Sequence, residues 1–498
     1  MIPKRKAAAV TAACFIAAAL ASCGHEPLME EEIEIPEPVT TAEMPTEEET
    51  EPPTEEETTG ECQPEEPVIM LGTGGDTFTV VAWNRDEAPI LIADWLGADV
   101  NDVKSGKSLK APSGAEVNFV CFNTGGYDAF DCYDRMFSSG DDIDVYLCEP
   151  DWARKLTDDD SRSAPMSALG ITEEVLGDMY PYTIEQGKNS SGVLKALAWD
   201  ASPGCFTYNA ELAKEYLGAE TPEEMQALIS DWDKFTETAE LVAKKSDKKT
   251  ALADSLGSMW QAYSSGGFSM PLVVGNKPVI GDEVRDFADM AKKLWECGGV
   301  SHNSQWTDDW YENGRNGGCM GCFIPAWGFA DGAFGLEMTG GDTLGKWALC
   351  EGPQPYWWGG TMLAVNPATD NGDEAYDLIY SAVFDELNFM DFASQTAYLP
   401  NCRSLVGYLK TREWELSDEF KANDLIWQHF TNGGDRLSIL DKNAKAIDLT
   451  DKITRYDADI SCAMFDAIEY KYIKDGRSWE DTVSFMQDDI AVSCPELD

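Results

Sequence analysis

Histidine is scarce in this chain. Only three of the 498 residues are histidine: His25, His302 and His429. They are scattered, so they cannot form a histidine-rich metal cluster, and the H-E-x-x-H motif of zinc proteases is absent. The G-x-S-x-G turn that carries the nucleophile of α/β-hydrolases is absent too. Nothing in the sequence nominates a nucleophile, and we expect neither an enzyme, nor a cofactor, nor a bound metal.

Positive charge is also in short supply. The chain has 37 Lys and Arg residues against 90 Asp and Glu residues, for a formal net charge of −53. The stretch 26–66 holds 17 glutamates and no basic residue, yet the remainder is still acidic by about two to one. Nucleic-acid binding needs a positively charged surface, and so does docking on anionic lipid head groups. The charge therefore argues against both, and it suits a neutral or cationic ligand better than an anionic one.

Long apolar runs are absent after the first 23 residues. Those residues comprise Lys4-Arg5-Lys6, an apolar run 7–20 and then Leu20-Ala21-Ser22-Cys23, which is the pattern of an export signal. A cysteine after Leu-Ala-Ser resembles the lipobox of bacterial lipoproteins. That resemblance implies lipidation of Cys23 and a protein anchored on the extracellular face of the cell membrane. An ordinary signal peptide with a chance cysteine is the alternative.

Fourteen cysteines are present, and 12 remain after Cys14 and Cys23 are set aside. Exported chains can form disulfides, but one sequence does not reveal their pairing. The pair Cys319 and Cys322 forms a lone C-x-x-C. Such a pair suits a redox site, half a zinc site, or two unreactive thiols, and the motif alone does not separate them.

The chain divides into three parts by composition. After the signal, residues 24–76 are rich in Glu, Thr and Pro, bury little, and are predicted to form a disordered acidic tether. Residues 77–498 exceed the size at which one hydrophobic core stops growing, so two lobes are expected. No repeat of 20–50 residues occurs, which argues against a solenoid.

Strands and helices alternate at the start of this body. Residues 77–83 read as a buried strand, 127–138 as an amphipathic helix and 141–148 as another strand, which predicts an α/β fold with a parallel sheet. Further strands are expected at 115–122, 194–199, 322–327 and 358–366, and further helices at 89–96, 210–217, 222–230, 231–245, 284–297 and 374–384.

Tryptophans recur where predicted strands end. Trp83, Trp152, Trp327 and Trp358 all lie at or near such ends. In an α/β sheet, ligands bind in the crevice beyond the carboxyl ends of the strands. Flat indole faces suit the apolar side of a sugar ring, and nearby carboxylates accept hydrogen bonds from its hydroxyls. The alternative is that these indoles are core residues.

Several segments together resemble a known family. In chain order they are Thr79–Trp83, Asp142–Tyr146, Leu197–Asp200, Phe206–Asn209, Trp232–Phe235, Phe323–Trp327, Trp358–Asn366, Tyr398–Pro400 and Gly476–Asp481. Their order and spacing are similar to those of the extracellular solute-binding proteins of carbohydrate ABC importers, the maltose-binding-protein-like family 1 type.

The resemblance implies a two-lobe, periplasmic-binding-protein-like α/β fold of type II, with a ligand cleft between lobes joined by hinge crossovers. Lobe 1 would comprise 77–200 and 361–420, and lobe 2 would comprise 201–360 and 421–498. The crossovers would lie near 200–204, near 360–364 and loosely at 420–430. The implied ligand-binding residues are Trp83, Asn84, Asp151, Trp152, Asp200, Trp327, Trp358 and Gly360.

The implied function is reversible capture of a sugar or oligosaccharide and its delivery to ABC permease subunits, by a monomer that contacts the membrane only through its lipid. Cys148 stands where maltose-binding protein has a stacking tryptophan, so Trp152 would substitute for it or that subsite would be absent. Three alternatives stay open: an exported glycosidase or lyase, a surface interaction module without a permease, and a binding protein for peptide or polyamine cargo.

Overall fold

The computed structural model describes residues 70–85, 87–412 and 424–498. The predicted signal, Cys23 and most of the predicted tether lie outside these residues. The last residues of that tether belong to the body instead. The Gly72 amide donates to the Thr369 carbonyl (3.0 Å) and the Gly75 amide to the Asp370 carbonyl (2.9 Å). A Cβ at residue 72 would lie 2.9 Å from the Asp370 Cα, so glycine is what permits this close approach.

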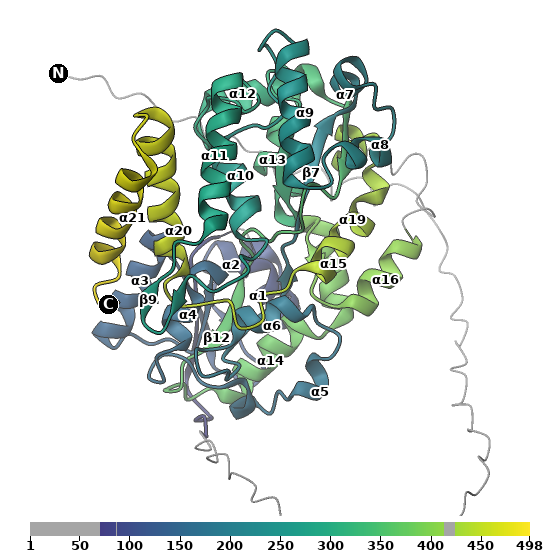
Figure 1. The fold of residues 1–498 in the computed structure, drawn as a ribbon. Helices are drawn as coiled ribbons and strands as arrows, with labels where there is room; N and C mark the ends of the chain where they lie inside the picture. The colour runs from purple at the N-terminus through teal and green to yellow at the C-terminus, as the bar shows by residue number, and fades with distance from the viewer. Residues whose placement is uncertain (1–69, 86, 413–423) are drawn as a thin grey trace, which may run out of the picture. The chain divides into compact units, whose positions relative to one another are not determined.

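Lobe 1 is built on a six-stranded sheet in the order β2-β3-β1-β4-β12-β5. Alternate residues along a strand face opposite sides of the sheet and pack into different hydrophobic clusters. Val80 and Leu147 face one side, for example, whereas Val81 and Tyr146 face the other. Helices cover both faces (Figure 1). The strands are β1 (Thr77–Ala82), β2 (Leu109–Lys110), β3 (Glu116–Cys121), β4 (Val145–Cys148), β5 (Ala196–Ala198) and β12 (Met362–Val365).

The helices of lobe 1 include the predicted amphipathic one. α3 spans Gly126–Ser139, and Tyr133 is fully buried on its inner side, with Phe130 and Phe137 packed beside it. The others are α1 (Ala88–Leu96), α2 (Val100–Lys104), α4 (Pro150–Thr157), α5 (Glu173–Leu176), α6 (Pro181–Gly187), α14 (Gly372–Val383) and α15 (Glu386–Thr396).

The prediction of a parallel sheet is only partly correct. β1 pairs in parallel with β3 and with β4, but β12 lies between β4 and β5 and runs antiparallel to both. The reason is topological. β12 returns from the other lobe rather than from a covering helix, so it enters the sheet from the opposite end.

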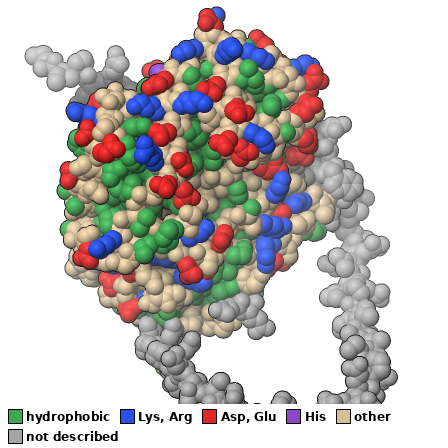
Figure 2. Space-filling view, in the orientation of Figure 1, with side chains coloured by type: hydrophobic (Ala, Val, Ile, Leu, Met, Phe, Trp, Pro, Cys, Tyr) green, Lys and Arg blue, Asp and Glu red, His purple; other side chains and the backbone are tan. Residues whose placement is uncertain are grey.

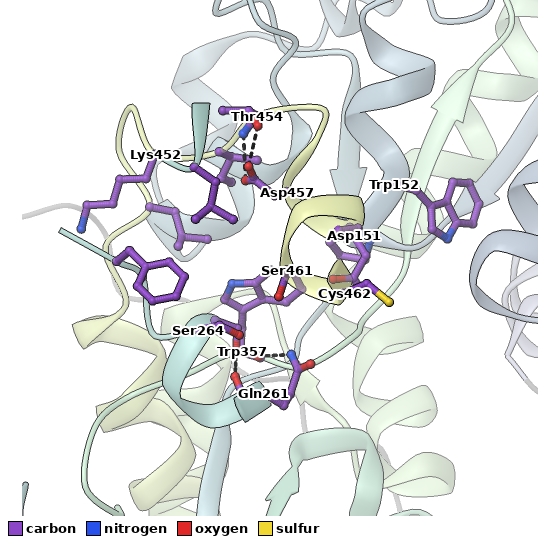
Figure 3. Close-up of a pocket in the computed structure, with 18 of the residues that line it drawn as sticks. Asp151, Trp152, Gln261, Ser264, Trp357, Lys452, Thr454, Asp457, Ser461 and Cys462 are labelled. Atoms are coloured by element: carbon purple, nitrogen blue, oxygen red, sulfur yellow. Dashed lines mark hydrogen bonds between the residues drawn. The ribbon is translucent and has the colours of Figure 1, made fainter. Parts of the chain in front are cut away.

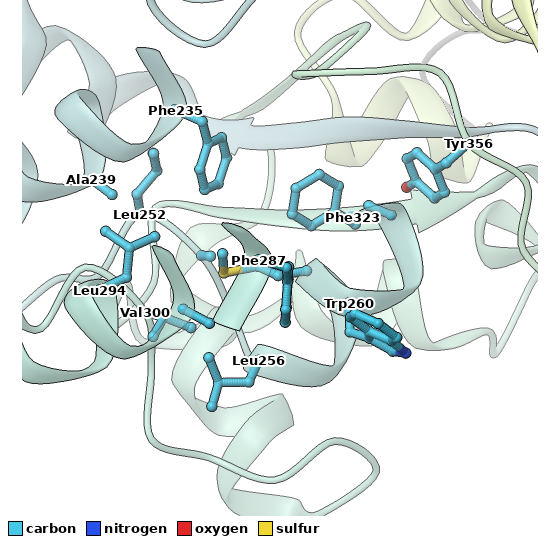
Figure 4. Close-up of a cluster of buried hydrophobic side chains, with 14 of the residues drawn as sticks. Phe235, Ala239, Leu252, Leu256, Trp260, Phe287, Leu294, Val300, Phe323 and Tyr356 are labelled. Carbon is cyan, nitrogen blue, oxygen red and sulfur yellow. The ribbon is translucent and has the colours of Figure 1, made fainter. Parts of the chain in front are cut away.

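Lobe 2 is built on a three-stranded sheet in the order β10-β7-β11, namely Gly321–Pro325, Gly204–Asn209 and Trp347–Cys350. Phe206 and Phe323 on one face lead into a large hydrophobic cluster with Phe235, Trp260 and Phe287 (Figure 4). The helices of lobe 2 are α7 (Ala210–Leu217), α8 (Pro222–Leu228), α9 (Trp232–Lys245), α10 (Leu256–Ser264), α11 (Asp282–Cys297), α12 (Asp308–Arg315), α13 (Phe334–Met338), α20 (Asp457–Asp466), η6 (Ala467–Lys474) and α21 (Trp479–Ser493).

The chain passes between the two sheets at residues 199–203 and 351–361. β6 (Asp200–Ala201) lies on the first passage and pairs with β13 (Leu399–Pro400). Gly359 and Gly360 lie on the second passage with φ of 67° and 103°, in the region that favours glycine. Part of the predicted third crossover lies outside the described residues. Next to that gap come α16 (Arg403–Arg412), α18 (Leu425–His429) and α19 (Arg436–Ala446).

Two surface properties bear on function. Acidic and basic side chains are interspersed over the face shown in Figure 2, with hydrophobic side chains exposed between them. Over the described residues, every helix is either too short or too polar to serve as a bilayer span.

Candidate functional site

A pocket of about 350 Å³ lies where elements of the two lobes meet. Lobe 1 contributes the turn into α4, with Glu149 and Asp151, and lobe 2 contributes α10 and α20 (Figure 3). Pockets of a few hundred Å³ with apolar walls and a few polar groups are typical ligand sites. The lining residues used below are Glu149, Asp151, Trp152, Trp260, Gln261, Phe268, Trp357, Lys452, Asp457 and Phe465.

Aromatic side chains form much of the wall. Trp260 of α10 stacks on Phe465 of α20, with ring centroids 6.1 Å apart and an interplanar angle of 20°. The Trp260 Nε1–H donates to the Ser461 Oγ (3.0 Å), which fixes the plane of the indole. Gln261 and Ser265 donate to the Trp357 carbonyl and hold that loop against α10. The wall is therefore apolar and rigid, but Trp260 itself is only 5% exposed and offers little ring surface to the pocket.

Three carboxylates from both lobes face this wall. Burial raises the pKa of Asp151 to about 7, and the neighbouring Glu149 and Asp457 raise it further. The Asp151 carboxylate is open to the water of the pocket, but protein surrounds the pocket, so its hydration is incomplete. Burial also raises the pKa of Glu149, and it raises that of Asp457 to about 6.

Two of these carboxylates are held by the protein, and the third is not. Glu149 accepts from the Trp152 Nε1–H (3.0 Å) and from the Gly126 amide (2.9 Å), and Asp457 accepts from the Thr454 amide (2.8 Å). In the described part of the chain, the Asp151 carboxylate has no hydrogen bond or ion pair. A pocket with one free carboxylate acceptor suits a ligand rich in hydroxyl or ammonium donors.

Helices α4 and α20 are tied together beside the pocket. Lys155 of α4 pairs with Asp459 of α20 at 2.6 Å, and both side chains are partly buried. Arg154 of α4 donates to the Ile453 carbonyl at the start of the same segment. Because α4 packs in the lobe 1 core and α20 in the lobe 2 core, the ion pair is a contact between lobes.

Replacing Asp459 by Asn is expected to increase the ligand dissociation rate about fivefold. The substitution removes the ion pair between the lobes, and a partly buried pair of this kind contributes about 1 kcal/mol. Stopped-flow displacement would measure the rate. Glu220→Gln, which removes the exposed Lys214–Glu220 pair of lobe 2, is the control. Equal rates in the two variants would contradict a role for the ion pair in holding the two lobes together.

Of the predicted ligand residues, Asp151 and Trp152 line this pocket, and they do so differently. Asp151 opens into it, whereas Trp152 is only 2% exposed and packs against Tyr133 in the lobe 1 core. Figure 3 shows the Trp152 indole on the side away from Lys452 and Thr454. Its main role in this structure is to fill the core and to orient Glu149.

Of four further predicted residues, Asp200 and Gly360 lie on the passages between the lobes, and Trp83 and Asn84 follow β1. Asp200 is 2% exposed and accepts from the Ser202 Oγ (2.7 Å) and the Thr361 amide (3.3 Å), so it braces both passages; burial raises its pKa to about 7. A Cβ at Gly360 would lie 3.0 Å from the Ser202 Oγ. Asn84 contacts Glu87 within its own loop. Trp83 is half-buried beside Gly125.

Trp327 and Trp358 belong to a separate aromatic cluster. The Trp327 Nε1–H donates to the Trp358 carbonyl (2.7 Å), and the two rings meet edge to face at 6.0 Å. The group also contains Phe334, Trp310 and Trp306, and we call these five residues the aromatic cluster. Both indoles are partly exposed. None of these five residues lines the pocket, but Trp357, the chain neighbour of Trp358, does.

The C-x-x-C pair lies in the core. Cys319 and Cys322 are fully buried, and burial raises the pKa of both thiols well above the ordinary value. Thiolate is the reactive and metal-binding form, so this environment disfavours redox or metal chemistry. The 11 cysteines in the described ranges are all free thiols. Across those same ranges, no group of three or more His, Cys, Asp or Glu residues is placed to hold a metal.

Sequence reasoning missed several pocket residues. Trp260, Trp357, Asp457 and Phe465 line the pocket but were not predicted to do so. Trp357 had a usable signal, because it adjoins the predicted Trp358. The other three come from helices about 200 residues apart in sequence, and only tertiary packing brings them together.

Comparison with known proteins identifies the fold. No protein-family model matches the chain, and no curated protein matches its sequence. Solved structures do match. One is described as an extracellular solute-binding protein of family 1 (TM-score 0.67, 15% identity, covering 84% of this chain and 100% of that one).

Two further matches have named sugar ligands or roles. The galacto-N-biose/lacto-N-biose I-binding protein of an ABC transporter from Bifidobacterium longum matches with TM-score 0.61 and 15% identity, over 85% of this chain and 98% of its own. The sugar-binding protein MalE of Xanthomonas citri matches with TM-score 0.59 and 15% identity, over 83% and 98%. The predicted α/β two-lobe architecture is thus confirmed: the chain has the fold of the extracellular solute-binding proteins of family 1.

Proposed function

We propose that this protein is the substrate-binding component of an ABC importer. It captures a sugar or oligosaccharide between its two lobes and delivers it, unchanged, to a membrane permease. The observation that carries the proposal is the pocket between the lobes, where aromatic walls and carboxylates from both sides surround one space. A ligand that bridges the lobes favours the closed form over the open one, and a permease can read that difference.

The fold supports a carrier rather than an enzyme. Structures with this fold include a lacto-N-biose binder and a MalE sugar-binding protein, both matched over most of their length. Five of the eight predicted ligand residues enter this proposal, in different roles. Asp151 contacts the ligand directly, Trp327 and Trp358 border it, and Asp200 and Gly360 shape the hinge.

The proposed location is the outer face of the cell membrane, with a diacylated Cys23 as the anchor and residues 24–70 as the spacer. The basic start, the apolar run and Leu-Ala-Ser-Cys support this proposal. Mass spectrometry of the mature N-terminal peptide tests it. A lipid-modified Cys23 would support anchoring, and a free Cys23 thiol would exclude it.

A glycan screen tests the function itself. The full chain is incubated with a panel of mono- and oligosaccharides, thermal stability is recorded, and each glycan is then recovered and analysed. We expect a rise in melting temperature with intact glycan. Release of shorter products would favour the exported-enzyme alternative, since two carboxylates are also the machinery of glycosidases. Stabilisation by polyamines or basic peptides alone would favour cationic cargo.

The unliganded protein is expected to lose stability as pH rises from about 5 to about 7.5. The pKa values of Asp151, Asp200, Asp254 and Asp457 are raised from 3.8 to about 6 or 7, with burial as the main cause. The folded state therefore binds these protons more tightly than the unfolded state does. This stabilisation is present at low pH and is lost as pH rises through the folded pKa values.

Buried His429 has a lowered pKa and acts in the opposite direction, but it is one group against four. Urea unfolding at several pH values would measure the effect. Ligand affinity should show the reverse trend and rise toward pH 8, because the ionised Asp151 is the better acceptor. A flat or rising stability curve across this range would contradict the assigned environments.

A further inference from the structure

Trp306 is an exposed tryptophan in a strained backbone conformation. It lies just before α12 with 53% of its surface exposed, and its φ is +65°. Among the described residues with positive φ, it is the only aromatic one. Such conformations carry an energetic cost and concentrate at functional sites. An indole that is mostly exposed recovers little of that cost by burial.

The ring of Trp306 is nonetheless held in place from several sides. Its centroid lies 5.2 Å from that of Trp310 and 5.3 Å from that of Phe334, both edge to face. Both of these supporting rings are buried. The strained backbone and the two rings therefore present one open indole surface in a fixed orientation.

Two links connect this surface with residues that line the pocket. The Trp306 ring lies 6.1 Å from that of Trp358, whose neighbour Trp357 lines the pocket. On the other side, the Gln305 side chain fills the space beside Gly257 in the first turn of α10, the helix that supplies Trp260 and Gln261 to the pocket. Trp306 thus lies one ring beyond Trp358, outside the residues that line the pocket.

We propose that Trp306 forms an outer subsite for a sugar ring, which makes the protein selective for oligosaccharides that reach beyond the pocket. This inference rests on the proposed function. It adds that the Trp306 side chain determines which ligand length the protein prefers. The occupant is a pyranose ring, because its apolar face suits an indole that offers no charge and only one edge donor.

The test uses malto-, cello-, xylo- and galacto-oligosaccharide series of one to six units, titrated calorimetrically against the wild-type protein and Trp306→Ala. In the series that binds, wild-type affinity should rise with length. Trp306→Ala should lower the affinity for the longest members about tenfold and leave the shortest that binds unchanged. Tyr380→Ala removes a comparably exposed aromatic from α14 of lobe 1 and is the control.

A second measurement uses the wild-type protein alone, so it does not depend on whether a variant folds. Oxidation of the wild-type protein followed by peptide mass spectrometry should show Trp306 protected by a hexasaccharide and not by the shortest ligand. Equal loss of affinity at all lengths, no loss at any length, or no protection of Trp306 would overturn the subsite while leaving the proposed function intact. If no glycan bound the wild-type protein, the proposed function would fail, and the subsite with it.

Discussion

Asp151→Asn is expected to weaken ligand binding roughly 10- to 100-fold. The Asp151 carboxylate is open to the pocket and has no partner within the described residues, so a ligand can use it fully. A hydrogen bond to a charged group contributes about 1.5–3 kcal/mol, and the neutral amide cannot replace that contribution. Calorimetry with the tightest glycan from the screen would measure the loss.

The same substitution should not destabilise the unliganded protein. It removes one of three neighbouring negative charges, so at pH 8 the melting temperature should stay level or rise. Opposite effects on affinity and stability distinguish a ligand-binding residue from a structural one. Asp233→Asn, on the exposed surface of α9, is the matched control and should change neither quantity. Unchanged affinity in Asp151→Asn would remove this residue from the site.

Trp327→Ala is expected to lower both affinity and stability. A tryptophan that only stacks on a sugar could be removed without a change in melting temperature. Trp327 instead donates to the Trp358 carbonyl and packs against the cores of both lobes. Its loss should reduce the free energy of unfolding by about 3 kcal/mol, the lower end for tryptophan truncation because the side chain is only partly buried.

Loss of the Trp327 indole should also weaken binding by about 1–3 kcal/mol if it contributes a stacking surface. Trp327→Phe keeps a ring without the Nε1–H and should recover part of both losses. Denaturant unfolding and calorimetry on the same preparations would separate the two effects. Full affinity in a destabilised Trp327→Ala protein would assign the residue to the hinge core alone.

Local sequence patterns predicted much of the fold. The helix predicted at 210–217 has the bounds of α7, and α3 is the amphipathic helix predicted at 127–138. Asp231, the first residue of the helix predicted at 231–245, caps α9 by accepting from the Lys234 amide (2.8 Å). These features depend on residues within a few positions of one another, which is why one sequence suffices.

The predictions that missed depend on distant contacts. The antiparallel direction of β12 follows from the passage between lobes and leaves no trace in the strand itself. α10 was not predicted because Gly257, Ser258 and Ser264 are weak helix formers. Its Trp260 is buried against Phe287, a contact with a distant residue that the local sequence does not reveal. Trp260 and Asp457 meet in the pocket from positions about 200 residues apart, beyond the reach of any local pattern.

A crystal structure of the full chain with the tightest glycan from the screen would show directly whether a sugar binds between the two lobes. We expect an intact sugar there, in contact with Asp151 on one side and with Trp357 and Asp457 on the other. A glycan bound only on an outer face, or one cleaved in the pocket, would contradict capture between the lobes without chemistry.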